Sequence, residues 1–185
     1  MVRFARKKKE AVPDQQPAQP SKYNSQKTIL TVATGATVKV SRQDLKRFME
    51  TAYREDEHLI FDSELEAKYY RDMLLPLIKD GRITVELQPK FTLLEKFEKQ
   101  GTKHQAITYS PDFKVTYVRE GRVVLIDVKG AEDQKFPLKR KLFDANFPEY
   151  PPLVVMKYCK KFGGWITIEE YIKKKREENK QKKAQ

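Results

Sequence analysis

The sequence predicts an α/β (α+β) fold in which helices flank a central mixed β-sheet. Three observations predict it. Apolar residues recur at helical spacing in the first half of the chain, the period changes to two at Ile83, and helical and strand-like segments alternate afterwards. The order of helix, three central strands, helix, strand and helix is typical of helices packed on a sheet.

The chain of 185 residues is long enough for one domain with tails. Residues 1–22, with three prolines, are predicted to be a disordered basic tail, residues 23–172 the folded domain, and residues 173–185 a basic helical tail. The formal net charge is +12, but the tails hold +4 and +5 of it, which leaves +3 for the domain. The charge alone is therefore weak support for a nucleic-acid partner.

Cysteine content and hydropathy exclude several classes of protein. The single cysteine, Cys159, leaves no internal disulfide framework and no zinc site built on paired cysteines. The charged start of the chain has no apolar run behind it, and no segment is apolar enough to span a bilayer. We expect a cytoplasmic protein with no membrane partner.

Two helices are predicted before the strands. Residues 28–40 have β-branched residues around Gly35 and are predicted to form a short hairpin or an added strand. A helix is predicted from Ser41, with Asp44 as its capping-box partner. A second helix is predicted within 61–83, and Pro76 is expected to kink or shorten its last turn. Two i,i+4 rows run along this helix: Leu65, Tyr69, Met73 and Leu77, and beside them Glu66, Tyr70, Leu74 and Ile78.

The second half of the chain is predicted to alternate strands and helices. Only the tight turn Glu120–Gly121 separates the strands 106–118 and 122–130, so they are predicted to pair as an antiparallel hairpin. Thr167 and Glu170 form a capping box for the final helix. The other predicted elements are a strand over 83–97 interrupted at Pro89, a polar loop over 99–104, a short basic helix over 136–148, a strand over 153–159 and the final helix over 167–180.

The strand 122–130 carries a carboxylate and an amine on one face of an otherwise apolar run. Alternation places Leu125, Asp127 and Lys129 on the same side. In a hairpin that turns near residue 120, Asp112 and Asp127 fall near opposite ends of one rung. Because burying a charge is costly unless something compensates, this convergence needs a specific explanation.

Metal-assisted chemistry is one explanation. Two carboxylates a few ångströms apart repel each other unless a cation lies between them, and hard oxygen ligands with open positions suit Mg²⁺. Lys129 beside such a metal could orient a water, and the metal would lower the pKa of that water. The reaction indicated is hydrolysis of a phosphodiester by a metal-activated water.

The residues also carry a family resemblance. "SPDF" at Ser110–Phe113 followed by "DVK" at Asp127–Lys129 resembles the signature of the PD-(D/E)xK nucleases. The chain is similar above all to a small group of phage-encoded members, long described only as a domain of unknown function, that resemble endonucleases of the Holliday-junction-resolvase type. The similarity spans roughly residues 23–158. Its further motifs are Tyr23–Lys27, Phe61–Tyr70, Gly81–Leu93 and Phe136–Phe143.

This resemblance implies a restriction-endonuclease-like core and a set of roles. Asp112 and Asp127 would bind the metal, Lys129 would be the catalytic lysine, Glu66 would complete the site, and the Val128 carbonyl is a further ligand candidate. The cofactor implied is Mg²⁺, with Mn²⁺ as a substitute. Candidates for DNA contact are Ser63, Gln88, Lys139 and Lys141.

The resemblance further implies branched or recombination-intermediate DNA as the substrate, in the host-cell cytoplasm if the protein is phage-encoded. A homodimer is expected if a four-way junction is cut, because two opposing strands must be cleaved. Residues 28–60 look longer than the family's spacer and are interpreted as an insertion with an extra helix.

Simpler readings of the same residues stay open. Asp112 could be an ordinary turn residue after Ser110 and Pro111, and Asp127 with Lys129 a same-face ion pair on an edge strand. Glu66 could serve a capping box with Ser63, and residues 139–141 could be a solvated helix face. The alternative functions are a nickase or less selective endonuclease in phage DNA processing or packaging, a non-catalytic DNA-binding module with a relic site, and a structural protein that binds acidic partners through its tails.

Overall fold

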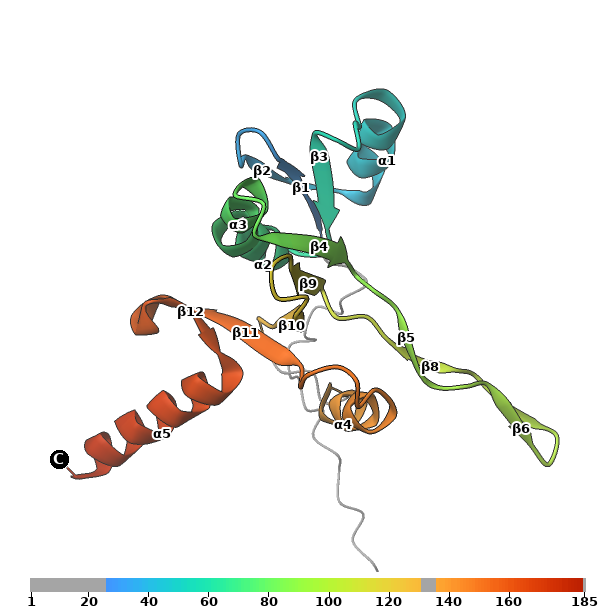
Figure 1. Ribbon diagram of the computed structural model, residues 1–185, viewed down its shortest axis with the longest axis vertical. Helices are drawn as coiled ribbons and strands as arrows, with labels where there is room; N and C mark the ends of the chain where they lie inside the picture. The colour runs from blue at the N-terminus through green and yellow to red at the C-terminus, as the bar shows by residue number, and fades with distance from the viewer. Residues whose placement is uncertain (1–25, 131–135, 185) are drawn as a thin grey trace, which may run out of the picture.

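A five-stranded mixed sheet forms the centre of the protein. The computed structural model describes residues 26–130 and 136–184, and the predicted tail 1–22 lies outside them. Only β10 and β11 run parallel, while the other neighbours are antiparallel, which confirms the predicted mixed sheet flanked by helices (Figure 1). The strand order is β12 (Gly164–Thr167), β11 (Val154–Cys159), β10 (Val123–Val128), β9 (Phe113–Tyr117) and β4 (Ile83–Leu87).

Helices cover both faces of this sheet. The helix α4 (Phe136–Asn146) connects the parallel strands β10 and β11, since parallel neighbours require a crossover rather than a tight turn. The other face is covered by α2 (Glu64–Tyr69), the π-helical turn η2 (Tyr70–Leu74) and α3 (Leu75–Lys79). The two helical layers give the sheet a separate apolar core on each side.

The register of β9 and β10 sets which side chains enter each core. Ile126 pairs with Phe113 in an antiparallel hairpin that turns at Gly121, as predicted. Phe113 and Ile126 pack toward α2, whereas Leu125 packs with Phe143 of α4. The predicted facing of β10 is therefore confirmed, and it places Asp127 on the α4 side of the sheet.

The predicted second helix is continuous from residue 64 to residue 79, but a π-helical turn interrupts its α-helical hydrogen bonding. Pro76 has no N–H to continue the α-helical hydrogen bonds, and the preceding turn is π-helical, with the N–H of Leu75 bonded to the carbonyl of Tyr70. The inserted residue displaces everything after Tyr70 around the helix axis. As a result Leu75 is buried and Met73 is 41% exposed, so the prediction that Met73 continues the row of Tyr69 was wrong.

The segment before the second helix builds a small sheet of its own. β1 (Lys27–Thr31) pairs with β2 (Thr37–Val40), which confirms the predicted hairpin, and also with β3 (His58–Phe61), which was not predicted. The helix α1 (Arg42–Thr51) starts at Ser41, whose Oγ accepts a hydrogen bond from the N–H of Asp44 at 3.1 Å.

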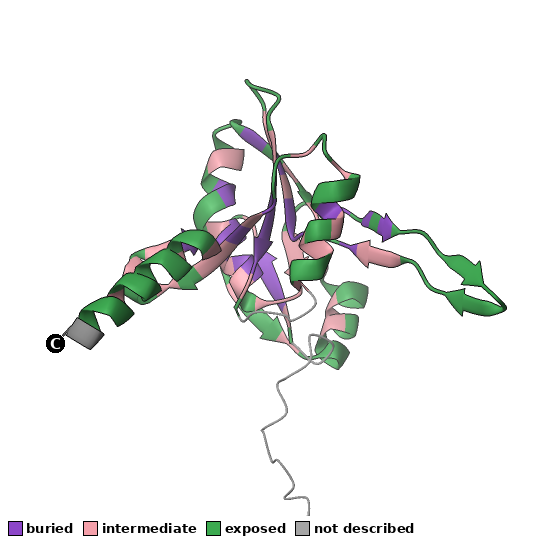
Figure 2. Ribbon diagram, turned by 90° about the horizontal axis from the view of Figure 1, so that it is seen from below, coloured by how far each residue is buried: buried purple, intermediate pink, exposed green. Residues whose placement is uncertain are grey.

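A two-stranded ribbon, residues 91–109, projects from the main sheet, and we call it the arm (Figures 1 and 2). At its base β5 (Phe91–Leu94) pairs with β8 (Ile107–Tyr109), and at its tip β6 (Phe97–Lys99) pairs with β7 (Thr102–His104). The prediction of a polar loop over 99–104 was wrong. Gln100 and Gly101 have φ of 50° and 80°, which makes them the two-residue turn of a hairpin.

The C-terminal part adds a strand and a long helix. β12 was not predicted, and it pairs antiparallel with β11. The capping box of Thr167 and Glu170 is confirmed by a hydrogen bond between Thr167 Oγ1 and Glu170 Oε2 at 3.1 Å, and α5 (Ile168–Ala184) follows it. The predicted tail over 173–185 is thus the continuation of α5 as far as residue 184. No helix within the described ranges is long and apolar enough to cross a membrane.

Candidate active site

The hairpin of β9 and β10 brings the predicted aspartates together at one end of the main sheet. The ladder ends at the pair of Ile126 and Phe113, and Asp127 and Asp112 are the next residues on the two segments. The Val128 N–H donates a hydrogen bond to Asp112 Oδ2 at 2.6 Å, which anchors this carboxylate to β10. Two segments that are separate in sequence thus place two carboxylates on the α4 side of the sheet.

Lys129 completes this cluster. Its Nζ lies 2.7 Å from Asp127 Oδ2, and its ammonium lies 5.1 Å from the centre of the Phe136 ring. Asp127 is 1% exposed and the Lys129 side chain 12% exposed, so the pair is buried. A buried ion pair contributes little stability compared with apolar residues of similar size, so its presence favours a role beyond folding.

Among the residues that the structure describes, the charge of the cluster is unbalanced, because two aspartates face one lysine. Burial, followed by the negative charges of Asp127 and Glu66, raises the pKa of Asp112 to about 8. The Val128 N–H and Lys129 act in the opposite direction without offsetting this effect. The site therefore lacks positive charge, and a bound cation would supply it.

Val128 is the main-chain ligand candidate at the same place. In a strand a residue points its N–H and its C=O toward the same side. The Lys129 N–H donates to the Met156 carbonyl of β11, whereas the Val128 N–H donates to the Asp112 carboxylate, so the Val128 carbonyl also points to the side of Asp112. The ladder of β9 and β10 ends at Ile126 and Phe113, before Val128. The position of the Val128 carbonyl is therefore compatible with a role as a ligand.

Tyr109 is a residue of this site that sequence reasoning missed. It is 5% exposed on β8, and burial, followed by the charges of Asp127 and Asp112, raises its pKa above the ordinary value. Among the described residues, the Tyr109 hydroxyl and the Asp127 oxygens form no hydrogen bond of standard geometry. The contact of Asp127 with Lys129 is an ion pair. Tyr109 lies only three residues before Asp112, but β8 pairs with β5 rather than β10, so alternation along one strand could not reveal the contact.

Glu66 lies at the start of α2, where it does form the capping box that the sequence left open. Its carboxylate accepts hydrogen bonds from Ser63 Oγ at 2.9 Å and from the N–H of Asp62 at 3.2 Å. Glu66 is nevertheless only 3% exposed, and its negative charge contributes to the raised pKa of Asp112. The same carboxylate thus stabilises the helix start and adds negative charge to the cluster.

Ser63, a candidate for DNA contact, is the N-cap of α2. We expect Ser63→Ala to lower the free energy of unfolding by about 1 kcal/mol, because the N–H of Glu66 loses its acceptor. Ser63→Asn should restore most of the loss, since asparagine also caps helices. Urea denaturation of both variants checks this, and an unchanged stability of Ser63→Ala would argue against the capping role.

The other DNA-contact candidates are not part of the carboxylate cluster. Gln88 has φ of 48° at the bend between β4 and the arm, where its N–H donates to the Asp112 carbonyl at 3.0 Å while its side chain is exposed. Lys139 is half-buried and Lys141 exposed on α4. Between them, Arg140 bonds Glu169 and the Leu153 carbonyl, which ties α4 to neighbouring elements.

The donor set fits a hard divalent cation that keeps open positions. No group of three or more His, Cys, Asp or Glu side chains among the residues described is placed to hold a metal by itself. Two carboxylates and a carbonyl would leave sites for water and substrate phosphate, which is the usual mode of Mg²⁺ binding. The buried, unbalanced charge of Asp112 and Asp127 is the observation that such an ion would explain.

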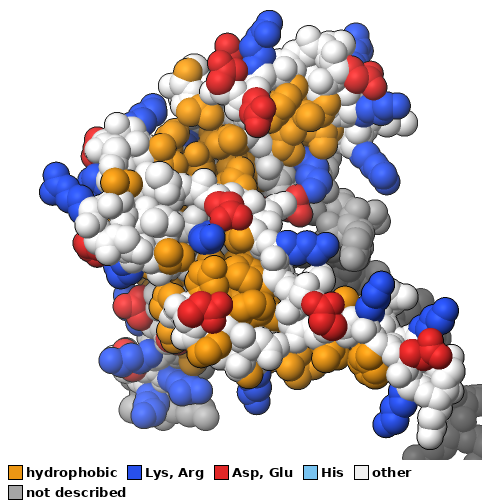
Figure 3. All heavy atoms as spheres, turned by 45° about the vertical axis from the view of Figure 1, so that its right-hand side comes forward, with side chains coloured by type: hydrophobic (Ala, Val, Ile, Leu, Met, Phe, Trp, Pro, Cys, Tyr) orange, Lys and Arg blue, Asp and Glu red, His pale blue; other side chains and the backbone are white. Residues whose placement is uncertain are grey.

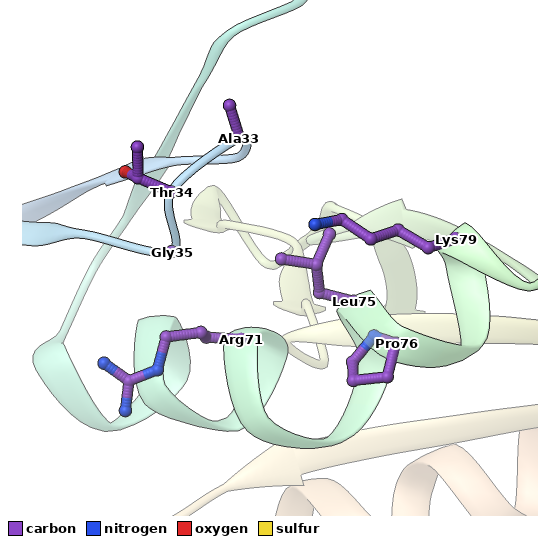
Figure 4. A pocket seen from close by; sticks show the side chains of 7 residues that line it. All are labelled: Ala33, Thr34, Gly35, Arg71, Leu75, Pro76 and Lys79. Atoms are coloured by element: carbon purple, nitrogen blue, oxygen red, sulfur yellow. The ribbon is translucent and has the colours of Figure 1, made fainter.

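A surface hollow lies elsewhere (Figure 4). It is formed between the turn after β1 and the outer side of the π-helical turn and α3. Its lining contains Arg71 and Lys79 but no carboxylate, so it offers no ligand to a cation. The chemistry that the side chains support is at the end of β10 and not in this hollow.

The fold and the site define a class, namely a mixed α/β protein with two buried aspartates and a lysine at the end of a central strand. A family model described as "Protein of unknown function (DUF1064)" matches residues 52–163, more than half of the chain, and the protein belongs to this family. The match contains all the residues of the cluster and leaves β1, β2 and α1 outside. Searches of curated proteins and of solved structures gave no significant match.

Proposed function

We propose that this protein is a metal-dependent DNA endonuclease with a restriction-endonuclease-like PD-(D/E)xK core. The observation that carries the proposal is the buried cluster of Asp112, Asp127 and Lys129, in which the described residues supply one lysine to two carboxylates. A structural role would not require this arrangement, because apolar residues would stabilise the same positions better.

The residues have distinct tasks in the proposed reaction. Asp112 and Asp127, with the Val128 carbonyl, would hold Mg²⁺, for which Mn²⁺ could substitute. The ion, when bound, lowers the pKa of a coordinated water and neutralises charge on the phosphate. Lys129 orients the attacking water and donates hydrogen bonds to the scissile phosphate. The attacking water releases a proton to solvent as its oxygen bonds to phosphorus, the bond to the leaving oxygen breaks, and that oxygen takes up a proton from solvent.

The substrate we propose is branched or recombination-intermediate DNA of a phage or prophage, as for a Holliday-junction resolvase. The resemblance to phage-encoded nucleases supports this choice, and the net charge of +12 favours a polyanionic partner. A four-way junction would be cut by a homodimer. A less selective endonuclease or nickase is the alternative within the same chemistry, and a DNA-binding module with a relic site is the alternative without it.

Cleavage of labelled DNA tests the proposal. We expect the protein to cut a four-way junction in Mg²⁺ or Mn²⁺ with paired incisions, and to leave linear duplex and single strands intact. Mg²⁺ should also raise the melting temperature, since a ligand that binds only the folded state stabilises it. EDTA should abolish both effects.

The outcomes separate the alternatives. Cutting of every substrate would keep the nuclease and remove the junction preference. DNA binding without cutting, together with no stabilisation by Mg²⁺ or Mn²⁺, would leave only the relic module. Stabilisation by metal without DNA binding would contradict DNA as the substrate.

A further inference from the structure

The arm has a length and a position that neither folding nor the proposed chemistry explains. Both of its strands leave the main sheet beside Asp112, since β4 ends at Leu87 and β9 begins at Phe113. From Phe91 to Gln100 an extended chain spans roughly 30 Å, at about 3.3 Å per residue. The base is buried at Phe91 and Leu93, but every residue from Leu94 to Ala106 is exposed (Figure 2).

The tip is a defined hairpin rather than a loose loop. Phe97, Glu98 and Lys99 pair in register with His104, Lys103 and Thr102, and the turn between them has two residues. The rings of Phe97 and His104 stack with centroids 4.5 Å apart and planes at 14°. A ribbon with a regular register and a cross-strand ring stack has a fixed shape, which a contact surface requires.

The charges of the tip favour a polyanion. The exposed stretch from Leu94 to Ala106 holds three lysines, Lys96, Lys99 and Lys103, against two glutamates, Glu95 and Glu98. None of these lysines forms an ion pair in the part of the chain that is described, whereas five lysines of the body each pair with a carboxylate: Lys27, Lys39, Lys68, Lys114 and Lys129. On the face of the body in Figure 3, Lys and Arg lie mainly around the edge and hydrophobic side chains in the middle, so the body itself offers no single basic patch there.

We propose that the arm is a second DNA-binding element, which lies along a groove of the duplex beside the cleaved position. A two-stranded ribbon fits the major groove, which is about 12 Å wide. Unpaired residues 95–96 and 105–106 separate the base of the arm from its tip, so the roughly 30 Å of a fully extended arm is an upper limit, equal to about nine base pairs at about 3.4 Å each. Its lysines would bind phosphates on either side of the groove. This inference rests on the proposed nuclease function, because it makes DNA the occupant.

A second copy of the chain is the rival occupant, since the outer edges of β6 and β7 are unpaired within the described structure. Lysines on an edge strand oppose pairing between copies, and two tips of the same charge repel each other. Charge complementarity therefore favours DNA over self-association.

The test compares two triple variants with equal loss of charge. The first is Lys96→Gln/Lys99→Gln/Lys103→Gln in the arm. The control is Arg42→Gln/Lys46→Gln/Arg47→Gln, three exposed residues of α1, a helix that lies at the top of Figure 1, away from the arm. Affinity for a 30-base-pair duplex and for a four-way junction is measured by fluorescence anisotropy in EDTA over a range of salt concentrations.

We expect the arm variant to bind at least about 10-fold more weakly at low salt, and its plot of log K against log[salt] to be shallower by about 2–3, because each phosphate contact contributes about 0.9 to that slope. The control should keep the wild-type affinity and slope. Equal slopes for the arm variant and the wild type would overturn the proposal, as would absence of DNA binding by the wild type.

The experiments distinguish failure of the proposed role of the arm from failure of the proposed nuclease function. Arm-dependent binding without cleavage in Mg²⁺ would keep the arm and reject the proposed function, whereas cleavage with arm-independent binding would do the reverse. Sedimentation of the same proteins reveals the rival: a dimer that the arm substitutions convert to a monomer, with DNA affinity unchanged, would make the arm an interface between copies.

Discussion

Lys129→Met is expected to reduce the cleavage rate by about 1,000-fold or more, while Mg²⁺ still stabilises the protein. Methionine keeps most of the apolar stem of the lysine beside Phe136 and removes only the charge. Groups that stabilise charge or position a water in a transition state typically contribute 10²–10⁴-fold, roughly, to the rate. The metal should bind at least as tightly, because a positive charge 2.7 Å from Asp127 has been removed.

Lys114→Met is the matched control. Lys114 projects from the same face of the sheet as Leu125 and pairs with Glu86 at 3.1 Å, away from the carboxylate cluster. A partly exposed ion pair contributes at most about 1 kcal/mol to the free energy of unfolding, so the variant should remain folded. We expect its cleavage rate to stay within about 3-fold of the wild type. Similar rates for both variants would argue that Lys129 takes no part in the reaction and serves only as the partner of Asp127.

Asp112→Asn is expected to stabilise the metal-free protein at pH 8 by a few kcal/mol and to abolish stabilisation by Mg²⁺. The carboxylate is 6% exposed beside Asp127, so removing its charge relieves both burial and repulsion. The amide oxygen of asparagine can still accept the hydrogen bond from the Val128 N–H. A substitution that raises stability and destroys activity is typical of a functional site.

The pH dependence follows from the sign of the pKa change. The pKa of Asp112 in the folded protein, about 8, lies above its ordinary value of 3.8. Its contribution to stability is therefore fully present below pH 4, declines as the pH rises, and is lost above pH 8. In EDTA, the free energy of unfolding of the wild type should fall between pH 5 and pH 9 more steeply than that of Asp112→Asn.

Urea denaturation at pH 5, 7 and 9 checks this expectation, with Asp144→Asn as a control for loss of an exposed carboxylate on α4. Parallel pH profiles for the wild type and Asp112→Asn would show that Asp112 titrates in its ordinary range. The burial of two like charges would then not be the property that defines the site.

The sequence predicted those features that depend on neighbouring residues. The alternation in 122–130 placed Leu125 and Asp127 on one face, and the turn at Gly121 set the register with Asp112, as the structure confirms. The capping boxes at Ser41 and Thr167 were likewise visible, because each is made within one helical turn. These local interactions do not depend on the position of the rest of the chain, so they can be predicted from the sequence before the fold is known.

Contacts between distant segments explain what the sequence could not predict. The burial of Leu75 in place of Met73 depends on the π-helical turn before Pro76, which no periodicity indicates. The arm was predicted in part as a loop, because its tip pairs only with itself and lacks an apolar face.

The sequence by itself determined the mixed α/β fold, the helix starts and the shared face of Asp127 and Lys129. Only the tertiary structure decided how deeply Asp112 is buried, that Tyr109 lies beside Asp127, and that the Val128 N–H bonds the Asp112 carboxylate. The physical reason is that burial and electrostatic coupling are properties of the assembled layers. The period of apolar residues in a strand or helix indicates which face a side chain lies on. The packing of the sheet against its helices decides which residues surround that side chain.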